Sequence, residues 1–130
     1  MITHIHQVQT FRATAQEIYD ALTDAAQFGE ITGAPAEIDP ANGGAFSLFG
    51  GMITGRVVEG QPARHLVQAW RSRSWDEGAY SIVSFMMTPD GGQTTVTLEH
   101  SGFPEGTGEH LNEGWNPNYW EPLHRRFPNA

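Results

Sequence analysis

Few residues of this 130-residue chain have both the chemistry and the position of a ligand-binding or catalytic site. His100 ends the alternating face of Val96 and Leu98, where an imidazole can fix the polar end of a ligand. A single histidine on such a face is more often a hydrogen-bonded core residue. Ser81, on another predicted strand, and the pair Asn118–Tyr119, on the last predicted helix, have the same two interpretations.

The sequence contains no motif for nucleophilic catalysis. Cysteine, the Gly-x-Ser-x-Gly elbow and a phosphate-binding glycine pattern followed by lysine are all absent. His4 and His6 share one face of a predicted strand, and Glu121 and His124 are three residues apart on a predicted helix. Neither pair has a third ligand at suitable spacing. We therefore predict no metal site, no cofactor and no catalytic residue, and we favour a protein that is not an enzyme.

The segment VQAWRSRSWDEG places two tryptophans and two arginines within six residues. In a structural interpretation Trp70 packs in the core, Trp75 covers the end of a strand, and Arg71 and Arg73 pair with the acids Asp76–Glu77. In a functional interpretation Trp70 forms a cavity wall and Trp75 its rim. We favour the structural interpretation first, with the pocket wall as a second role.

Alternating apolar residues predict a strand at 2–11, near a sheet edge because neither of its faces is cleanly apolar. Residues 45–60 predict two strands around a turn at Gly50–Gly51. Residues 65–72, 79–88 and 94–102 predict three more, with PDGGQ as a hairpin turn. Consecutive short strands with tight turns indicate an antiparallel meander.

Thr14 and Glu17 have capping-box spacing and predict a short helix that ends near Leu22. The proline- and glycine-rich residues 31–44 predict an irregular loop. Near the C-terminus an apolar stripe recurs every four residues, and prolines within it predict a long, kinked helix. The stripe comprises Leu111, Trp115, Tyr119, Leu123 and Phe127.

This order of elements predicts an α+β fold in which a curved antiparallel sheet surrounds the last helix. A curved sheet and one bulky helix rarely fit without a gap, so we expect a cavity between them. Gly114, which has no side chain, is expected to let the helix approach the sheet closely. The expected inward-facing and ligand-binding residues are Phe46, Leu48, Ile53, Val57, Trp70, Ser81, Val83, Phe85, Val96, Leu98, His100, Leu111, Trp115, Asn118 and Tyr119.

Length and charge narrow the class of protein. A chain of 130 residues is expected to form one domain, 1–130. Its net charge is −8 and all seven basic residues are arginines, so nucleic acid and anionic membranes are poor partners. We expect a cytoplasmic protein, because the sequence shows neither a membrane-spanning run nor a signal peptide.

Several motifs, in their order, resemble the C-terminal domain of the activator of heat shock protein 90 ATPase family. They are APAEIDPANGGAF, ITGRVVEGQPARHLVQAWRSRSWDEG, the GFP after the last strand, and GWNPNYWEPL in the final helix. The resemblance covers nearly the whole chain and places it in the START-like, birch-pollen-allergen-like superfamily. It implies a helix-grip fold, commonly with an apolar cavity, and a chaperone or another protein as a possible partner.

We therefore expect a binding module that holds a small apolar or amphipathic molecule between sheet and helix. A chaperone-associated protein-interaction domain is the first alternative. A polyketide cyclase- or aromatase-like enzyme is the second, since such a site can require only a shaped pocket and one acid or base.

The resemblance generates one prediction about activity. Eukaryotic members carry a separate N-terminal domain that contributes much of the chaperone stimulation, and 130 residues leave no room for it. We expect the purified chain alone to leave the steady-state ATPase rate of an Hsp90-type chaperone unchanged. A robust, concentration-dependent increase in that rate would contradict this expectation.

Overall fold

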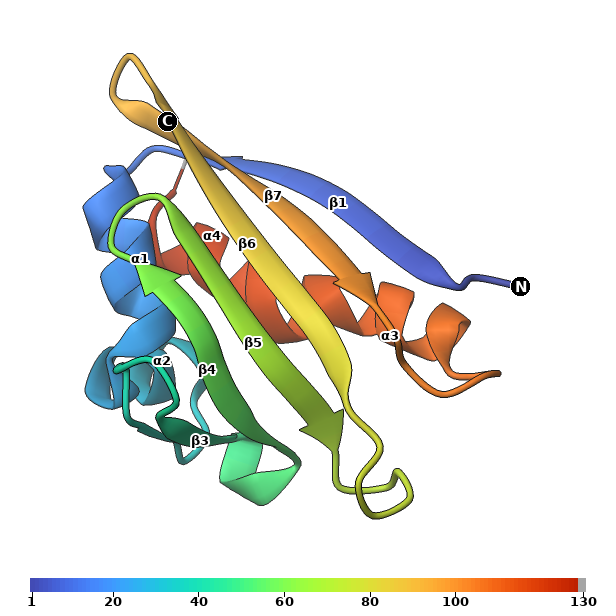
Figure 1. Ribbon diagram of the computed structural model, residues 1–130. Coiled ribbons are helices and arrows are strands. Elements are labelled where there is room, and N and C mark those ends of the chain that lie inside the picture. The colour runs from blue at the N-terminus through green and yellow to red at the C-terminus, as the bar shows by residue number, and fades with distance from the viewer. Residues whose placement is uncertain (129–130) are drawn as a thin grey trace.

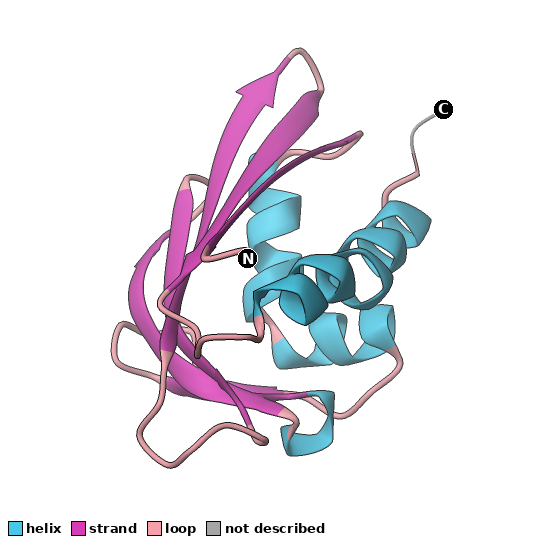
Figure 2. Ribbon diagram, turned by 90° about the vertical axis from the view of Figure 1, so that its right-hand side faces the viewer, coloured by secondary structure: helices cyan, strands magenta, loops and turns pink. Residues whose placement is uncertain are grey.

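In the computed structural model, which describes residues 1–128, one curved antiparallel sheet has the helices packed on its concave face (Figures 1 and 2). The strand order is β1-β7-β6-β5-β4-β3-β2. The strands are β1 (His4–Phe11), β2 (Glu37–Ile38), β3 (Ala45–Leu48), β4 (Ile53–Gln61), β5 (His65–Ser72), β6 (Ser81–Asp90) and β7 (Gln93–Ser101). The helical elements are α1 (Ala15–Thr23), α2 (Ala25–Thr32), the 3-10 turn η1 (Phe49–Gly51), α3 (Gly108–Trp115), the π-helical turn η2 (Asn116–Trp120) and α4 (Glu121–Arg126). This confirms the predicted α+β class and the antiparallel meander.

The strand register follows the alternation of the sequence. Trp70 pairs with Ser81 across β5 and β6, and Val83 pairs with His100 across β6 and β7. A shift of one residue would turn every one of these side chains to the solvent. Of the predicted inward-facing set, Ile53 and Leu111 are half-buried and Asn118 is exposed. The others are buried: Phe46, Leu48, Val57, Trp70, Ser81, Val83, Phe85, Val96, Leu98, His100, Trp115 and Tyr119.

Strand β1 lies at the sheet edge, as its mixed faces predict. Its inward face carries Gln7 and Gln9, and both amides contact the C-terminal helix. The indole Nε1 of Trp120 donates to Gln7 Oε1 at 2.6 Å, and His124 Nε2 lies 2.9 Å from Gln9 Oε1. The polar residues on this face therefore attach the edge strand to the helix, because each meets a hydrogen-bond partner there.

Helix α1 begins at the predicted capping box. Glu17 N donates to Thr14 Oγ1 at 3.1 Å, and Thr14 N donates to Glu17 Oε1 at 2.9 Å. The short helix α2, which the sequence analysis did not predict, follows immediately. Asp24 caps its start, and Gly33 ends it in the left-handed conformation (φ 75°).

The predicted loop at 31–44 is therefore only partly irregular. Its first two residues end α2, and Glu37–Ile38 form the short edge strand β2.

The C-terminal helix is continuous across Pro117, with a π-helical turn where the sequence predicts a kink. The N–H of Glu121 donates to the carbonyl of Asn116, five residues earlier. The wider turn places one additional residue on the apolar side, so Tyr119 and Trp120 are both buried. The four-residue stripe predicted from the sequence omits Trp120 for this reason.

Several glycines allow the chain to approach itself closely, Gly55 and Gly108 among them, but Gly114 does not. A Cβ at Gly55 would lie 1.9 Å from the carbonyl oxygen of Ala69, and one at Gly108 would lie 2.0 Å from that of Ile2. At Gly114 the nearest atom would be Asn118 Nδ2, at an ordinary 3.6 Å. The expectation that Gly114 permits close helix–sheet packing is wrong, since a methyl group fits there.

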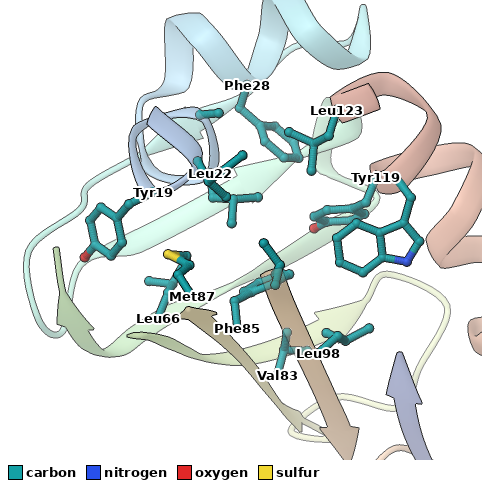
Figure 3. Close-up of a cluster of buried hydrophobic side chains, with 14 of the residues drawn as sticks. Tyr19, Leu22, Phe28, Leu66, Val83, Phe85, Met87, Leu98, Tyr119 and Leu123 are labelled. Atoms are coloured by element: carbon teal, nitrogen blue, oxygen red, sulfur yellow. The ribbon is translucent and has the colours of Figure 1, made fainter. Parts of the chain in front are cut away.

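The core fills most of the space between helices and sheet (Figure 3). Leu22, Phe28, Tyr119 and Leu123 point from the helices toward the sheet residues, as Figure 3 shows. The labelled sheet side chains are Leu66, Val83, Phe85, Met87 and Leu98. Among the described residues, no helix has both the length and the apolar character to cross a membrane.

Candidate functional site

A pocket of about 490 Å³ lies at one end of the seam between sheet and helix. Its walls come from η1 and the start of β4, the end of β5, the loop after β5, and one side of α3 and η2. The lining residues are Phe49, Met52, Ile53, Trp70, Ser72, Ser74, Trp75, Gly106, Thr107, His110, Leu111, Gly114, Trp115, Asn118 and Tyr119.

Aromatic rings dominate the deep part of this pocket. Trp115 stacks on Trp70 with ring centroids 5.9 Å apart and planes inclined by 27°. Trp75 lies 5.8 Å from Trp70, and Tyr119 lies 4.4 Å from Trp115. All four side chains are buried by their neighbours. Large apolar rings of this kind bind apolar groups through contact area and displacement of water.

A buried hydrogen-bond chain holds the two stacked tryptophans. Trp115 Nε1 donates to His100 Nδ1 at 3.2 Å, and His100 Nε2 lies 2.7 Å from Ser81 Oγ. An indole N–H can only donate, so His100 Nδ1 must accept and its proton must be on Nε2. Ser81 Oγ then accepts from the imidazole and donates to the carbonyl oxygen of Trp70 at 3.1 Å.

This chain makes His100 a neutral structural residue. The side chain is fully buried, and loss of hydration lowers the pKa of His100 to about 4. Although Ser81 is adjacent, the pair does not form a nucleophile and base, because the serine proton is directed at a backbone carbonyl and both ring nitrogens have partners. Of the two interpretations of His100, the hydrogen-bonded core residue therefore fits its surroundings.

Trp70 Nε1 and Tyr119 Oη are buried next to each other among the pocket residues, and neither atom has another hydrogen-bond partner within residues 1–128. An indole N–H can only donate, so the proton of the Tyr119 hydroxyl has no acceptor there. Burial raises the pKa of Tyr119 well above its ordinary value, so the hydroxyl keeps its proton at every physiological pH. In Figure 3 this hydroxyl points into the space between helix and sheet. An unpaired buried donor costs about 1–3 kcal/mol, so a ligand that supplies an acceptor there gains stability.

The two arginines of the Trp70–Trp75 segment have different contacts from those predicted. Arg71 donates to the carbonyl oxygens of Trp75 at 2.9 Å, Asp76 at 3.1 Å and Ala79 at 3.3 Å. The carbonyls of the loop after β5 therefore surround the guanidinium of Arg71, which holds the loop in place. The expected ion pairs with Asp76 and Glu77 do not form: backbone carbonyls occupy the donors of Arg71, and Arg73 contacts the sulfur of Met52 instead.

Six of the predicted ligand-binding residues line the pocket: Ile53, Trp70, Leu111, Trp115, Asn118 and Tyr119. The other seven are buried in the core outside it: Phe46, Leu48, Val57, Ser81, Val83, Phe85 and His100. Alternation identifies inward-facing residues but does not separate a cavity wall from a packed core. The sequence analysis missed several lining residues of the turns and of α3, namely Phe49, Met52, Ser72, Ser74, Gly106, Thr107, His110 and Gly114. Ser72 and Ser74 lie in the same family-like motif as Trp70, and this was the only feature of the sequence that pointed to them.

The histidines of β1 have a carboxylate partner that their spacing does not show. Glu99 on β7 accepts from His4 at 2.6 Å and also contacts His6. These contacts lower the pKa of Glu99, chiefly through its hydrogen bond with His6. Within residues 1–128, no group of three or more histidine, cysteine, aspartate or glutamate residues has an arrangement that could hold a metal ion.

Comparisons with known proteins identify related chains. A family model described as "Activator of Hsp90 ATPase homolog 1-like protein" matches residues 12–127. The human "Activator of 90 kDa heat shock protein ATPase homolog 1" is 29% identical over 119 residues, which are 92% of this chain and 35% of the human protein. This chain thus spans about a third of the length of the curated relatives that it matches.

Solved structures agree with the fold. The crystal structure of an HSP90 activator from Plasmodium falciparum is 26% identical, has a TM-score of 0.93, and matches over 99% of this chain and 100% of that one. CalU16 from Micromonospora echinospora is 23% identical with a TM-score of 0.80, over 94% of this chain and 74% of that one, and shows the shared fold alone. The predicted helix-grip fold and family resemblance are confirmed.

Replacing Trp115 tests whether the pocket wall also supports the core. Trp115→Ala removes five ring contacts and leaves His100 Nδ1 without its donor, so we expect the free energy of unfolding to fall by about 3–5 kcal/mol. Leu111→Ala, at a half-buried lining position, is expected to cost less, about 1–2 kcal/mol. Denaturant unfolding of both variants and wild type measures the difference. Equal losses for the two variants would show that Trp115 has no special structural role.

The burial of His100 predicts a pH dependence. Its pKa is about 4 in the folded protein and ordinarily 6.5, so the unfolded chain takes up the proton first as the pH falls. The contribution of His100 to the free energy of unfolding is fully present above pH 6.5. About 3 kcal/mol of it is lost as the pH falls from 6.5 to 4. NMR titration of the ring is expected to show no protonation in the folded protein above about pH 5. Titration of His100 near pH 6.5 would disprove the buried arrangement.

Proposed function

The chain belongs to the family of Activator of Hsp90 ATPase homolog 1-like proteins, and we propose that it is a binding module whose pocket holds the apolar part of a small amphipathic molecule. The observation that carries the proposal is the pocket itself. Its volume of about 490 Å³ lies within the range of roughly 300–1,000 Å³ that small-molecule sites occupy.

The lining has the mixture that such sites require. Three of the four tryptophans and one tyrosine provide apolar contact area. The Tyr119 hydroxyl, which lies against Trp70 Nε1 and has no acceptor for its own proton within residues 1–128, can orient a polar atom of the ligand. At the mouth the side chains of Met52, Ser74 and Asn118 are exposed, so a ligand can enter without unfolding of the core.

A second candidate function rests on the family relationship. The human relative is an ATPase activator homologue of a 90 kDa heat shock protein, and the Plasmodium falciparum structure is an HSP90 activator. This supports a chaperone-type protein partner for the present chain. An enzyme of the cyclase type is less favoured, because both ring nitrogens of His100 are occupied in the core. The single domain and the cytoplasmic location stay predictions.

Filling the pocket tests the first proposal. Gly114 lies on the lining in helical backbone, and a Cβ there meets no atom closer than 3.6 Å. Gly114→Phe adds a ring beside the tryptophans without removing a core contact, so we expect it to reduce binding of the neutral fluorophore Nile red at least tenfold. Fluorescence titration of the folded protein measures this affinity.

Two variants serve as controls for that experiment. Gly114→Ala changes the same position by one methyl group, and Glu113→Phe adds the same ring at an exposed neighbour outside the lining. Both are expected to bind the fluorophore as wild type does. If wild type does not bind it, or if Glu113→Phe weakens binding as much as Gly114→Phe, the pocket is not the site. Binding to a purified Hsp90-type chaperone that survives Gly114→Phe would favour the second candidate at a separate surface.

A further inference from the structure

Arg73 differs from the neighbouring Arg71 in having a guanidinium with neither an ion pair nor a backbone carbonyl partner in the described part of the chain. Arg73 is not itself a lining residue, but it contacts Met52, which is one. Arg71 uses its donors on three backbone carbonyls. Among the described residues, the one side-chain hydrogen bond of Arg73 runs from Nη2 to the sulfur of Met52, at 3.2 Å. Within residues 1–128, no carboxylate lies within 4.0 Å of Arg73. The cation is therefore available to another molecule.

The surroundings of Arg73 fix its place relative to the pocket. Its backbone N–H donates to the carbonyl of Met52 at 2.8 Å, so the start of the loop is attached to the turn before β4. Met52, Ser72 and Ser74, the three residues that surround Arg73, all line the pocket. The two serine hydroxyls lie 2.9 Å apart and add polar groups to the same rim. Trp70 of β5 lies three residues before Arg73 in the chain, and its ring contacts those of Trp75 and Trp115 in the deep part of the pocket.

We propose that Arg73 binds the carboxylate of an amphipathic ligand whose apolar chain lies against Trp70 and Trp115. This proposal rests on the proposed pocket function and specifies its ligand class as a single-chain amphiphile with an anionic head. A planar guanidinium presents paired N–H donors that match the two oxygens of a carboxylate. A neutral alcohol presents a single uncharged oxygen to the same fork, and an ammonium head is repelled.

The net charge of the protein strengthens the inference. At −8 the surface as a whole repels anions, so an anionic ligand needs a local cation to bind in preference to a neutral one. Arg73 is exposed, and water and salt screen its interaction. The expected preference for the anion is therefore about fivefold, and it declines as ionic strength rises.

A matched series of ten-carbon probes tests the assignment. Sodium decanoate, 1-decanol and decyltrimethylammonium share one chain length and differ in head group. Three of the four tryptophans line the pocket, so intrinsic fluorescence reports binding without a label. In wild type we expect decanoate to bind about fivefold more tightly than decanol, and decyltrimethylammonium to bind least. Arg73→Gln is expected to remove the preference for decanoate and to leave the affinity for decanol unchanged.

The control variant is Arg64→Gln. Arg64 is exposed in the turn between β4 and β5 and lies outside the pocket lining. Its substitution removes one positive charge, as Arg73→Gln does. It is expected to keep the preference for decanoate. Equal loss in both variants would assign the preference to overall charge and overturn the role of Arg73.

The remaining outcomes separate the two proposals. Equal affinities of wild type for decanoate and decanol would overturn the anionic ligand class and leave the apolar pocket in place. No binding of any ten-carbon probe, together with no binding of Nile red, would overturn the pocket function itself. Retention of the preference in Arg73→Gln would exclude Arg73 as the head-group residue.

Discussion

The hydrogen bond between Trp115 and His100 is the contact on which the arrangement of helix and sheet depends. It joins the C-terminal helix to β7 at the centre of the core, and its polarity determines the rest of the chain through Ser81 to the backbone of Trp70. Because an indole can only donate, a protonated imidazole would place two donors against each other. The fold therefore requires a neutral histidine, and burial provides this by disfavouring the charged form. The same bond holds Trp115 in its stack with Trp70, so the pocket wall and the core share one anchor.

The π-helical turn explains how one helix meets two different surfaces. In a regular α-helix Tyr119 and Trp120 would point about 100° apart, and only one of them would face the sheet fully. The additional residue in the turn lets Tyr119 contact Phe28 and Phe49 while Trp120 donates to Gln7 on the edge strand. Proline fits in this region because it has no N–H to place in the altered ladder. Edge strand, central core and pocket are thus connected through five consecutive residues, Asn116–Trp120.

The sequence was sufficient for six of the seven strands that residues 1–128 form and insufficient for the pocket. Alternation predicted those six and their inward faces, because in a sheet with one buried face the period of two leaves a single register. The two-residue strand β2 is too short to show alternation. Helix α2 was missed because its eight residues bury fully only Phe28 and contain Gly29, so they have little apolar pattern; its signals are the caps at Asp24 and Gly33. Trp120 was missed because the stripe assumed a regular α-helical period. His100 and Ser81 were predicted to face inward and do so, but their hydrogen-bond chain depends on residues from four elements, α3, β7, β6 and β5.

The position of the pocket follows from the sizes of the side chains along the helix. From Trp115 to Phe127 the buried face carries Trp115, Tyr119, Trp120, Leu123 and Phe127, and these bulky groups fill the concave sheet. Before Trp115 the same face carries Thr107, Leu111 and Gly114, which are small or only half-buried. The sheet does not narrow to compensate, because Arg71 holds the loop after β5 by its carbonyls and η1 holds the other side. The pocket therefore lies beside the start of the helix. There Trp115 of α3 stacks on Trp70 of β5, and the chain continues from Trp70 through Ser72 to the cation of Arg73.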